Sequence, residues 1–136
     1  MSEPAPPLVP DPDSVSAPFW EACARHELVV QTCLACGLPR YPPRPMCPAC
    51  GSLEHAWELS PGDAVLYSWV VAHPPVLPSL AARVPLAVLL VELAEGIRMV
   101  GNLAGRDADL EIGMPMRLDW LDVADACALP AWRPVP

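Results

Sequence analysis

Four of the six cysteines in this 136-residue chain lie in two copies of one short motif. The motif is C-x-A-C-G, and it spans Cys33–Gly37 and again Cys47–Gly51. Each copy offers two thiolates from one tight turn, and the glycine lets the backbone double back. Two such turns facing each other supply a tetrahedral shell for Zn²⁺ at sulfur–metal distances of ~2.3 Å. The predicted ligands are Cys33, Cys36, Cys47 and Cys50.

A shell of four thiolates is closed to water, which indicates one structural rather than catalytic zinc ion per chain. Ten residues separate Cys36 from Cys47, fewer than the ~15–20 of the commonest spacing. The same cysteines could instead form two disulfides or a thioredoxin-like redox motif. A redox motif has no reason to occur twice, so the sequence favours a zinc ribbon. Cys23 and Cys127 are expected to be buried or idle.

The composition indicates one small unit that has more apolar surface than its own core can bury. Hydrophobic residues make up 53% of the chain and the mean hydropathy is +0.30, both high for so small a protein. We therefore expect a partner chain. The longest apolar run, residues 84–91, is too short for a membrane span, and the first residues do not resemble a secretory signal. Zinc-bound thiolates suit a reducing compartment, so we expect a cytoplasmic protein.

The charge of the chain argues against nucleic acid as a partner. The net charge is −8, and acidic residues are crowded between Asp107 and Asp125. Such a surface repels phosphate backbones. Lysine is absent, so any side-chain cation that binds a phosphate or carboxylate must be an arginine, with its planar guanidinium.

Proline and apolar residues divide the chain into segments. Prolines dominate residues 1–13, which predicts a disordered tail. A capping serine followed by a proline predicts a helix over about 17–27. Its Phe19 and Trp20 face either a partner or the protein's own core. The expected organisation is a tail at 1–13, a helix at 14–27, a zinc ribbon at 28–55, a barrel at 56–126 and a C-terminal tail at 127–136.

After the ribbon, the sequence has a β pattern throughout. Glu95–Gly96, between two of the apolar runs, is a hairpin signal. Four or five strands in so short a stretch, with glycines available for bends, match a small five-stranded Greek-key barrel of the OB type. The predicted strands are 64–72, 86–93, 97–103 and 116–123.

Taken in order, these features resemble a family of small OB-fold proteins with a rubredoxin-like zinc ribbon, associated with acyl-CoA metabolism. The resemblance covers about residues 17–123. It implies a mainly β fold: a short N-terminal helix, the ribbon, and a small five-stranded OB-fold barrel. Besides both knuckles, the matching residues are Phe19–Trp20, Leu28–Gln31, Tyr41–Arg44, Ser52, Trp57, Gly62, Pro85, Glu95–Gly96 and Ile112–Met116.

Members of this family look like accessory subunits of thiolase-fold enzymes or hot-dog-fold enoyl-CoA hydratases. The resemblance therefore implies a non-catalytic subunit that assembles with a thiolase-like enzyme, a thiolase or aldolase of sterol side-chain or other acyl-CoA metabolism. The residues agree, because they offer no persuasive acid–base or nucleophile constellation. The alternatives are a hydratase accessory subunit, a module that binds single-stranded nucleic acid, and a free-standing hydrolase or redox enzyme.

An acyl-CoA-associated role makes arginine and aromatic residues the candidate contacts. Arg40 and Arg44 flank the second knuckle and could balance the zinc thiolates or bind CoA phosphates. Tyr41 and its prolines form a stiff ledge for an adenine or a partner. His73 begins a long loop but lacks a neighbour in sequence to orient it as a base. The expected contacts with CoA or the partner are Arg40, Tyr41, Arg44, His73, Arg83 and Arg98, with Phe19 and Trp20 on the helix.

Overall fold

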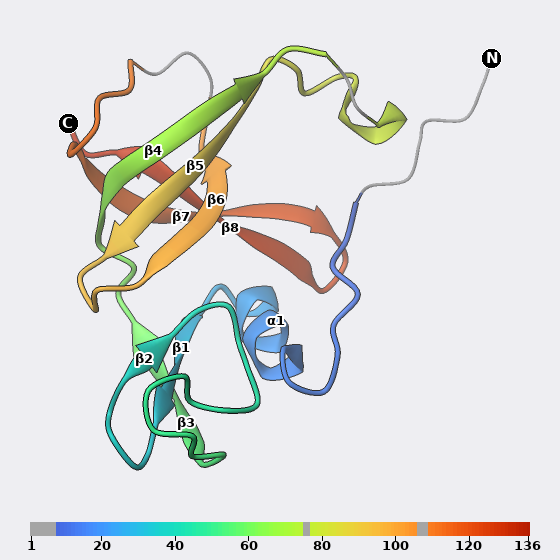
Figure 1. Ribbon diagram of the computed structural model, residues 1–136. Coiled ribbons are helices and arrows are strands. Elements are labelled where there is room, and N and C mark those ends of the chain that lie inside the picture. Colours follow the sequence, from blue (N-terminus) through green and yellow to red (C-terminus); the bar gives the residue numbers. More distant parts are fainter. Residues whose placement is uncertain (1–7, 75–76, 106–108) are drawn as a thin grey trace.

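The computed structural model describes residues 8–74, 77–105 and 109–136. Over these ranges the protein consists of a three-stranded sheet flanked by a helix and of a closed five-stranded barrel (Figure 1). The predicted fold class is confirmed: the chain is mainly β, with a short N-terminal helix, a zinc ribbon and then a small barrel. No helix in the described ranges has the length and apolarity needed to cross a membrane.

The ribbon sheet is built around its central strand. Strand β1 (Leu28–Cys33) pairs antiparallel with β2 (Pro39–Arg40) on one side and with β3 (His55–Ser60) on the other. The sequence predicts a barrel from residue 56 onward, but the hydrogen bonds of β3 join it to the ribbon sheet. The difference arises because a strand pattern identifies a strand without telling which sheet it joins.

Helix α1 (Ala17–Ala24) is shorter than the predicted helix, which extended to residue 27. The amides of Arg25 and His26 donate to carbonyls three residues back instead of four. His26 then adopts a φ of 58°, a left-handed conformation that ends the helix.

Aromatic residues of α1 pack into the protein itself. Phe19 is 1% exposed and Trp20 is half-buried against it, with ring centroids 5.0 Å apart in an edge-on arrangement. Phe19 therefore packs in the protein's own core, one of the two settings that the sequence left open for it. A large aromatic near a terminus fits either setting by type alone, so the sequence could not distinguish them.

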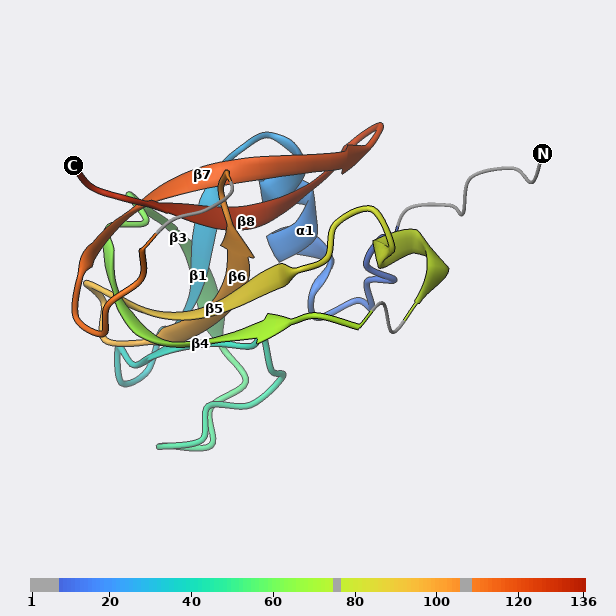
Figure 2. The same cartoon turned by 90° about the horizontal axis from the view of Figure 1, so that it is seen from above.

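The barrel has the strand order β4-β5-β6-β8-β7. It closes through two residue pairs between β4 and β7, Ala64 with Met116 and Val65 with Pro115. Figure 2 shows β7 and β8 running together across the barrel, with β4 on its opposite side. The strands are β4 (Ala64–Ala72), β5 (Leu86–Leu93), β6 (Arg98–Leu103), β7 (Pro115–Ala124) and β8 (Cys127–Pro134).

Strand β8 corrects the predicted C-terminal tail at 127–136. It pairs antiparallel with β7 along most of its length and parallel with β6 at Ala131 and Trp132. The prolines of β8 made a strand improbable by sequence, because proline lacks the N–H that a ladder needs. Pro130 is tolerated here, and its carbonyl accepts a hydrogen bond from the Asn102 side chain.

One hydrophobic core joins the two parts. Trp132 of β8 is fully buried, and its indole N–H donates to the carbonyl of Gly62 at 2.9 Å in the segment between β3 and β4. The fully buried side chains that share this core are Phe19, Cys23 and Leu28 from the ribbon part and Leu66, Leu89, Val91, Met99, Met116 and Trp132 from the barrel. The ribbon and helix are therefore packed on the barrel and are not a tethered module.

The connections agree with the sequence where they are described. Glu95–Gly96 forms the turn between the antiparallel strands β5 and β6, as predicted. The long connection from His73 to Pro85 contains a 3-10 turn at Pro78–Leu80, and its residues 75–76 lie outside the described residues.

Candidate metal centre and barrel cleft

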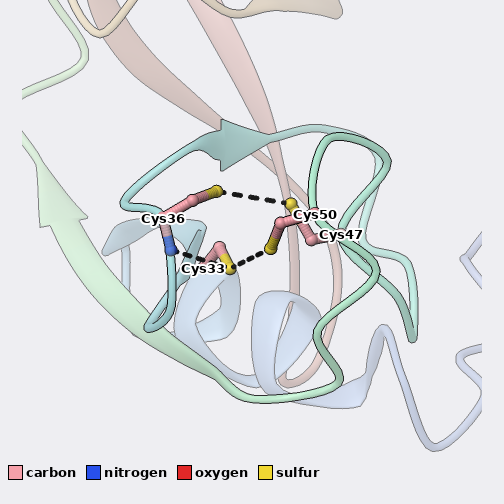
Figure 3. A group of neighbouring side chains, drawn as sticks. All are labelled: Cys33, Cys36, Cys47 and Cys50. Atoms are coloured by element: carbon pink, nitrogen blue, oxygen red, sulfur yellow. Dashed lines mark hydrogen bonds between the residues drawn. The ribbon is translucent and has the colours of Figure 1, made fainter.

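The two C-x-A-C-G motifs face each other across the tip of the ribbon. Cys33 ends β1 and Cys36 lies in the turn that follows, while Cys47 and Cys50 come from a second turn before β3. All four sulfurs point into one space between the turns (Figure 3). Cys33 and Cys47 are buried, whereas Cys36 and Cys50 are exposed.

The spacing of the sulfurs fits a tetrahedral metal shell. The pairs Cys33–Cys50 and Cys36–Cys47 are each 3.6 Å apart, and all four sulfurs lie within 4.8 Å of one another. Ligands at ~2.3 Å from a tetrahedral zinc ion lie about 3.8 Å apart. A disulfide needs sulfurs at about 2.05 Å, so the cysteines are free thiols and not two disulfides.

Backbone geometry prepares each knuckle for metal. The amides of Gly37 and Gly51 each donate at 2.9 Å to the carbonyl of the first cysteine of their motif. Gly37 has a φ of 79° and Gly51 a φ of 78°, left-handed conformations in which a side chain would be strained. The backbone N–H of Cys36 donates to Cys33 Sγ and lowers the pKa of that thiol to about 6, which favours the thiolate that binds zinc.

These features identify the four cysteines as the site of one structural zinc ion. The donor set is all sulfur and supplies four ligands, which completes a tetrahedral shell and leaves no position for a substrate or water. When bound, the ion holds the two cysteine turns together where few buried apolar side chains could do so.

A buried polar network fixes the connector between the knuckles. Gln31 of β1 is 1% exposed, and its amide bonds Arg44 twice at 2.8 Å, donating to the Arg44 carbonyl and accepting from the Arg44 N–H. Arg40 is also buried and donates from Nε and Nη2 to the same carbonyl. Three donors on one carbonyl hold the chain in place just ahead of Cys47. Sequence reasoning missed Gln31, because a polar residue in a strand gives no sign of burial.

This network changes the expected roles of Arg40 and Tyr41. The Arg40 guanidinium is bound to the backbone of Arg44, so Arg40 is a positioning residue and not an exposed phosphate ligand. Tyr41 packs against Phe19 with ring centroids 5.6 Å apart, and burial raises the pKa of its hydroxyl. The stiff ledge expected for adenine is therefore largely internal. The Arg44 side chain is exposed and remains a candidate contact.

The other candidate contacts do not come together. His73 is exposed at the end of β4. Arg83 donates to the Asn102 side chain at 3.2 Å, near the end of β6. Arg98, at the start of the same strand, pairs with Glu92 at 3.1 Å and lies over the ring of Tyr67. Arg83 and Arg98 thus serve opposite ends of β6 and do not form one anion site.

A cleft of about 690 Å³ opens where β4 and β7 diverge. Trp69 and Val71 of β4 face it from one side and Trp120 of β7 from the other. Arg133 donates to Asp119 within the cleft and lowers the pKa of that carboxyl. The sequence does not predict this cleft, because its lining comes from strands far apart in the chain. Its other lining residues are Arg83–Ala87, Leu103–Gly105, Asp109, Leu110, Leu121 and Ala131.

The chain matches two family descriptions that together follow this architecture. Residues 20–56 match the ChsH2 rubredoxin-like zinc ribbon domain, and residues 57–121 match the C-terminal OB-fold domain of ChsH2.

Curated relatives and solved structures extend the match. The chain is 47% identical over 118 residues to a probable enoyl-CoA hydratase alpha subunit of Thermomonospora curvata. It is 39% identical over 133 residues to the 3-oxo-4,17-pregnadiene-20-carboxyl-CoA hydratase alpha subunit of Mycobacterium tuberculosis. These matches cover 85% and 91% of the chain but only 36% and 42% of the two relatives, so the chain spans less than half of their length.

Two matches cover most of the relative as well. A DUF35 domain-containing scaffold protein of Methanothermobacter thermautotrophicus is 33% identical over 65% of this chain and 68% of its own length. A solved chain described as Ltp2-ChsH2(DUF35) aldolase is 42% identical, with a TM-score of 0.84 over 92% of this chain and 98% of that one. The chain therefore belongs to the DUF35 family, in the ChsH2-type form that joins a rubredoxin-like zinc ribbon to an OB-fold domain.

Proposed function

We propose that this protein is a non-catalytic accessory subunit that assembles with and supports a thiolase-like enzyme, an aldolase or thiolase of acyl-CoA metabolism. The observation that carries the proposal is the match along 98% of a chain described as part of an Ltp2-ChsH2(DUF35) aldolase. The relative in Methanothermobacter thermautotrophicus is named a scaffold protein, which supports a role in assembly.

The internal chemistry of the chain supports a role without catalysis. Its metal centre uses all four sulfurs to hold two turns together and offers no open position for substrate. Across the described residues, the arginines with assigned side-chain bonds are engaged by carbonyl, amide or carboxylate groups of the same chain. These features support the proposal that the groups which make and break bonds in the substrate belong to the partner subunit.

The partner and substrate are proposed at the level of class. The steroid-like acyl-CoA in the name of the mycobacterial relative favours sterol side-chain or related acyl-CoA metabolism. An alternative is an accessory subunit of an enoyl-CoA hydratase, which the two relatives described as hydratase alpha subunits favour. We propose that the complex acts in the cytoplasm and binds no nucleic acid.

Reconstitution tests the proposal. The chain and a thiolase-like aldolase subunit are expressed alone and together, and acyl-CoA cleavage is measured for each. We expect a stable complex that cleaves the acyl-CoA substrate and no turnover by this chain alone. The partner subunit alone should have lower cleavage activity than the complex or be unstable. Turnover by the isolated, zinc-loaded chain would contradict the non-catalytic role. Activity with an enoyl-CoA hydratase subunit, and none with the aldolase subunit, would select the alternative.

A further inference from the structure

A groove of about 460 Å³, here called the junction groove, lies where the ribbon meets the barrel. Val30 and Thr32 of β1 line it from the ribbon sheet. Ala94 and Glu95 line it from the turn that joins β5 to β6, which points toward the ribbon in Figure 1. The groove therefore has one wall from each part of the protein. Its other lining residues are Gly37, Pro39, Glu58, Leu59 and Pro61.

The junction groove has a carboxylate on each wall and no positive charge to balance them. Glu58 comes from β3 of the ribbon and Glu95 from the barrel turn, and its lining among the described residues contains no arginine or histidine. The ion pairs of the described residues involve neither carboxylate. Arg98, the arginine nearest to Glu95 in sequence, pairs with Glu92 instead. The groove is thus complementary to a cation.

One oxygen of Glu95 is buried without a hydrogen-bond donor. Glu95 Oε2 is shielded from solvent, and no described residue donates to it. Burial of a carboxylate oxygen is costly unless a donor satisfies it, so nearly all such oxygens in folded proteins have one. This oxygen is a second sign, independent of the count of charges, that the groove receives a donor from another molecule.

The rest of the lining indicates what carries the positive charge. It is mostly apolar, with Val30, Pro61 and Ala94 in the groove and Leu59 at 71% exposure. Lysine and arginine side chains bury their methylene stems on apolar surface and place the charged end beside a carboxylate. A bare Ca²⁺ ion needs six to eight oxygens. Among the described residues, the four cysteines are the one cluster of three or more metal-binding side chains.

On the basis of the proposed function, we infer that the junction groove is the docking site for a lysine or arginine side chain of the thiolase-like partner subunit. The alkyl stem lies along the apolar lining, and the cationic end donates to the carboxylates of Glu58 and Glu95. A second copy of this chain is disfavoured as the occupant, because it has no lysine and each copy carries a net charge of −8. The docked side chain contacts the ribbon and the barrel together.

Neutral variants of the two glutamates test this docking site. Glu58→Gln and Glu95→Gln, made singly and together, remove the charges and keep the size of the side chains. Glu111→Gln is the matched control, because Glu111 is exposed and lies outside the groove lining. Affinity for the thiolase-like subunit is measured at low and at high salt. We expect the double variant to bind about tenfold more weakly and with a smaller salt dependence. The control should stay within about twofold of the wild type.

Thermal unfolding of the free chains separates docking from a structural role. Because Glu95 Oε2 has no donor in the free chain, Glu95→Gln should bind more weakly and yet unfold at the same temperature as the wild type or a higher one. Zinc content, measured on the same samples, should be unchanged. A loss of stability that accompanies the loss of affinity would assign Glu95 a structural role and overturn the inference.

The remaining outcomes distinguish the occupants. Wild-type affinity in the double variant, or an equal loss of affinity in Glu111→Gln, would overturn the junction groove and leave the accessory role intact. Calcium binding or self-association of the free chain that disappears in Glu95→Gln would assign the groove to a metal ion or to a second copy, and so would overturn the partner's side chain. Failure of the wild-type chain to bind any thiolase-like subunit would overturn both the groove and the proposed function.

Discussion

Single residues decide whether the ribbon can hold its metal. Cys33 and Cys47 are buried first members of their motifs, and each accepts hydrogen bonds from the backbone of its own turn. These hydrogen bonds from backbone N–H groups favour the thiolate form in the metal-free protein. They therefore reduce the free energy needed to deprotonate the two thiols when zinc binds.

Replacement of one ligand should remove the zinc. In Cys47→Ser, three thiolates remain and the buried turn loses its anchor, so zinc should fall from one per chain to well below half. Cys127→Ser is the matched control, since Cys127 lies on β8 outside the cluster, and it should retain one zinc. Elemental analysis of both purified chains measures the difference. Full zinc in Cys47→Ser would refute this ligand set.

Gln31 should matter for stability although it touches no metal. Gln31→Leu leaves the Arg44 amide without its buried partner, and we expect a loss of about 1–3 kcal/mol of unfolding free energy. Zinc should also pass faster to a competing chelator, because the connector before Cys47 is loosened. Glu58→Ala on the neighbouring strand β3 is exposed and should cost less than about 0.5 kcal/mol. Urea unfolding compares the two, and equal effects would assign the network no role.

At the scale of elements, the barrel depends on β8, a strand that the sequence pattern does not predict. β8 supplies Trp132 to the core, and β6 makes room for that ring with Gly101. A Cβ at Gly101 would lie 2.3 Å from Trp132 Cζ3, closer than atoms approach without a shift.

Gly101→Ala should therefore destabilise the barrel. Because the indole is fully buried and hydrogen-bonded to Gly62, it has little freedom to move, and we expect a loss of about 1–3 kcal/mol. Val100→Ala, one residue earlier and exposed, should cost about 0.5 kcal/mol or less. Thermal unfolding followed by tryptophan fluorescence measures both. A Gly101→Ala chain as stable as the wild type would show that the core can repack here.

The pairing of β7 with β8 should respond to acid. A hydrogen bond from Arg133 lowers the pKa of Asp119 below its ordinary 3.8, so the ionised carboxylate favours the folded state. This contribution is complete above that ordinary pKa and is lost as the pH falls through the lower pKa of the folded state. Asp119→Asn should therefore flatten the decline in stability below about pH 4. Unfolding free energies measured from pH 3 to 7 check this. An unchanged decline in stability at acid pH would show that Asp119 does not contribute to it.

Local pattern was sufficient for some elements and not for others. The knuckles, the four alternating strands and the Glu95–Gly96 turn depend on neighbouring residues, and all were predictable. β8 was missed because two prolines outweighed its apolar residues, and its stability comes from β7, which pairs with it. The burial of Arg40 and Gln31 was missed because it depends on the backbone of Arg44 across the ribbon. Long-range pairing decided each of these.

For the whole molecule, the net charge and the exposed apolar side chains indicate which class of partner the protein can bind. A net charge of −8 without lysine opposes the phosphate backbone of nucleic acids, which OB-fold modules otherwise bind through basic grooves. Exposed apolar side chains lie instead on both parts of the protein, on β4 of the barrel and on the ribbon at Leu34, Met46, Leu53 and Leu59. This distribution suits a protein partner.

We propose that this chain works as the zinc-containing accessory subunit of a thiolase-like enzyme. Affinity purification of the tagged chain from its own cells, with mass spectrometry and zinc analysis of the same sample, tests it most directly. We expect a stoichiometric thiolase-like subunit together with one zinc per chain. Recovery of the chain alone, or with nucleic acid, would contradict the accessory role.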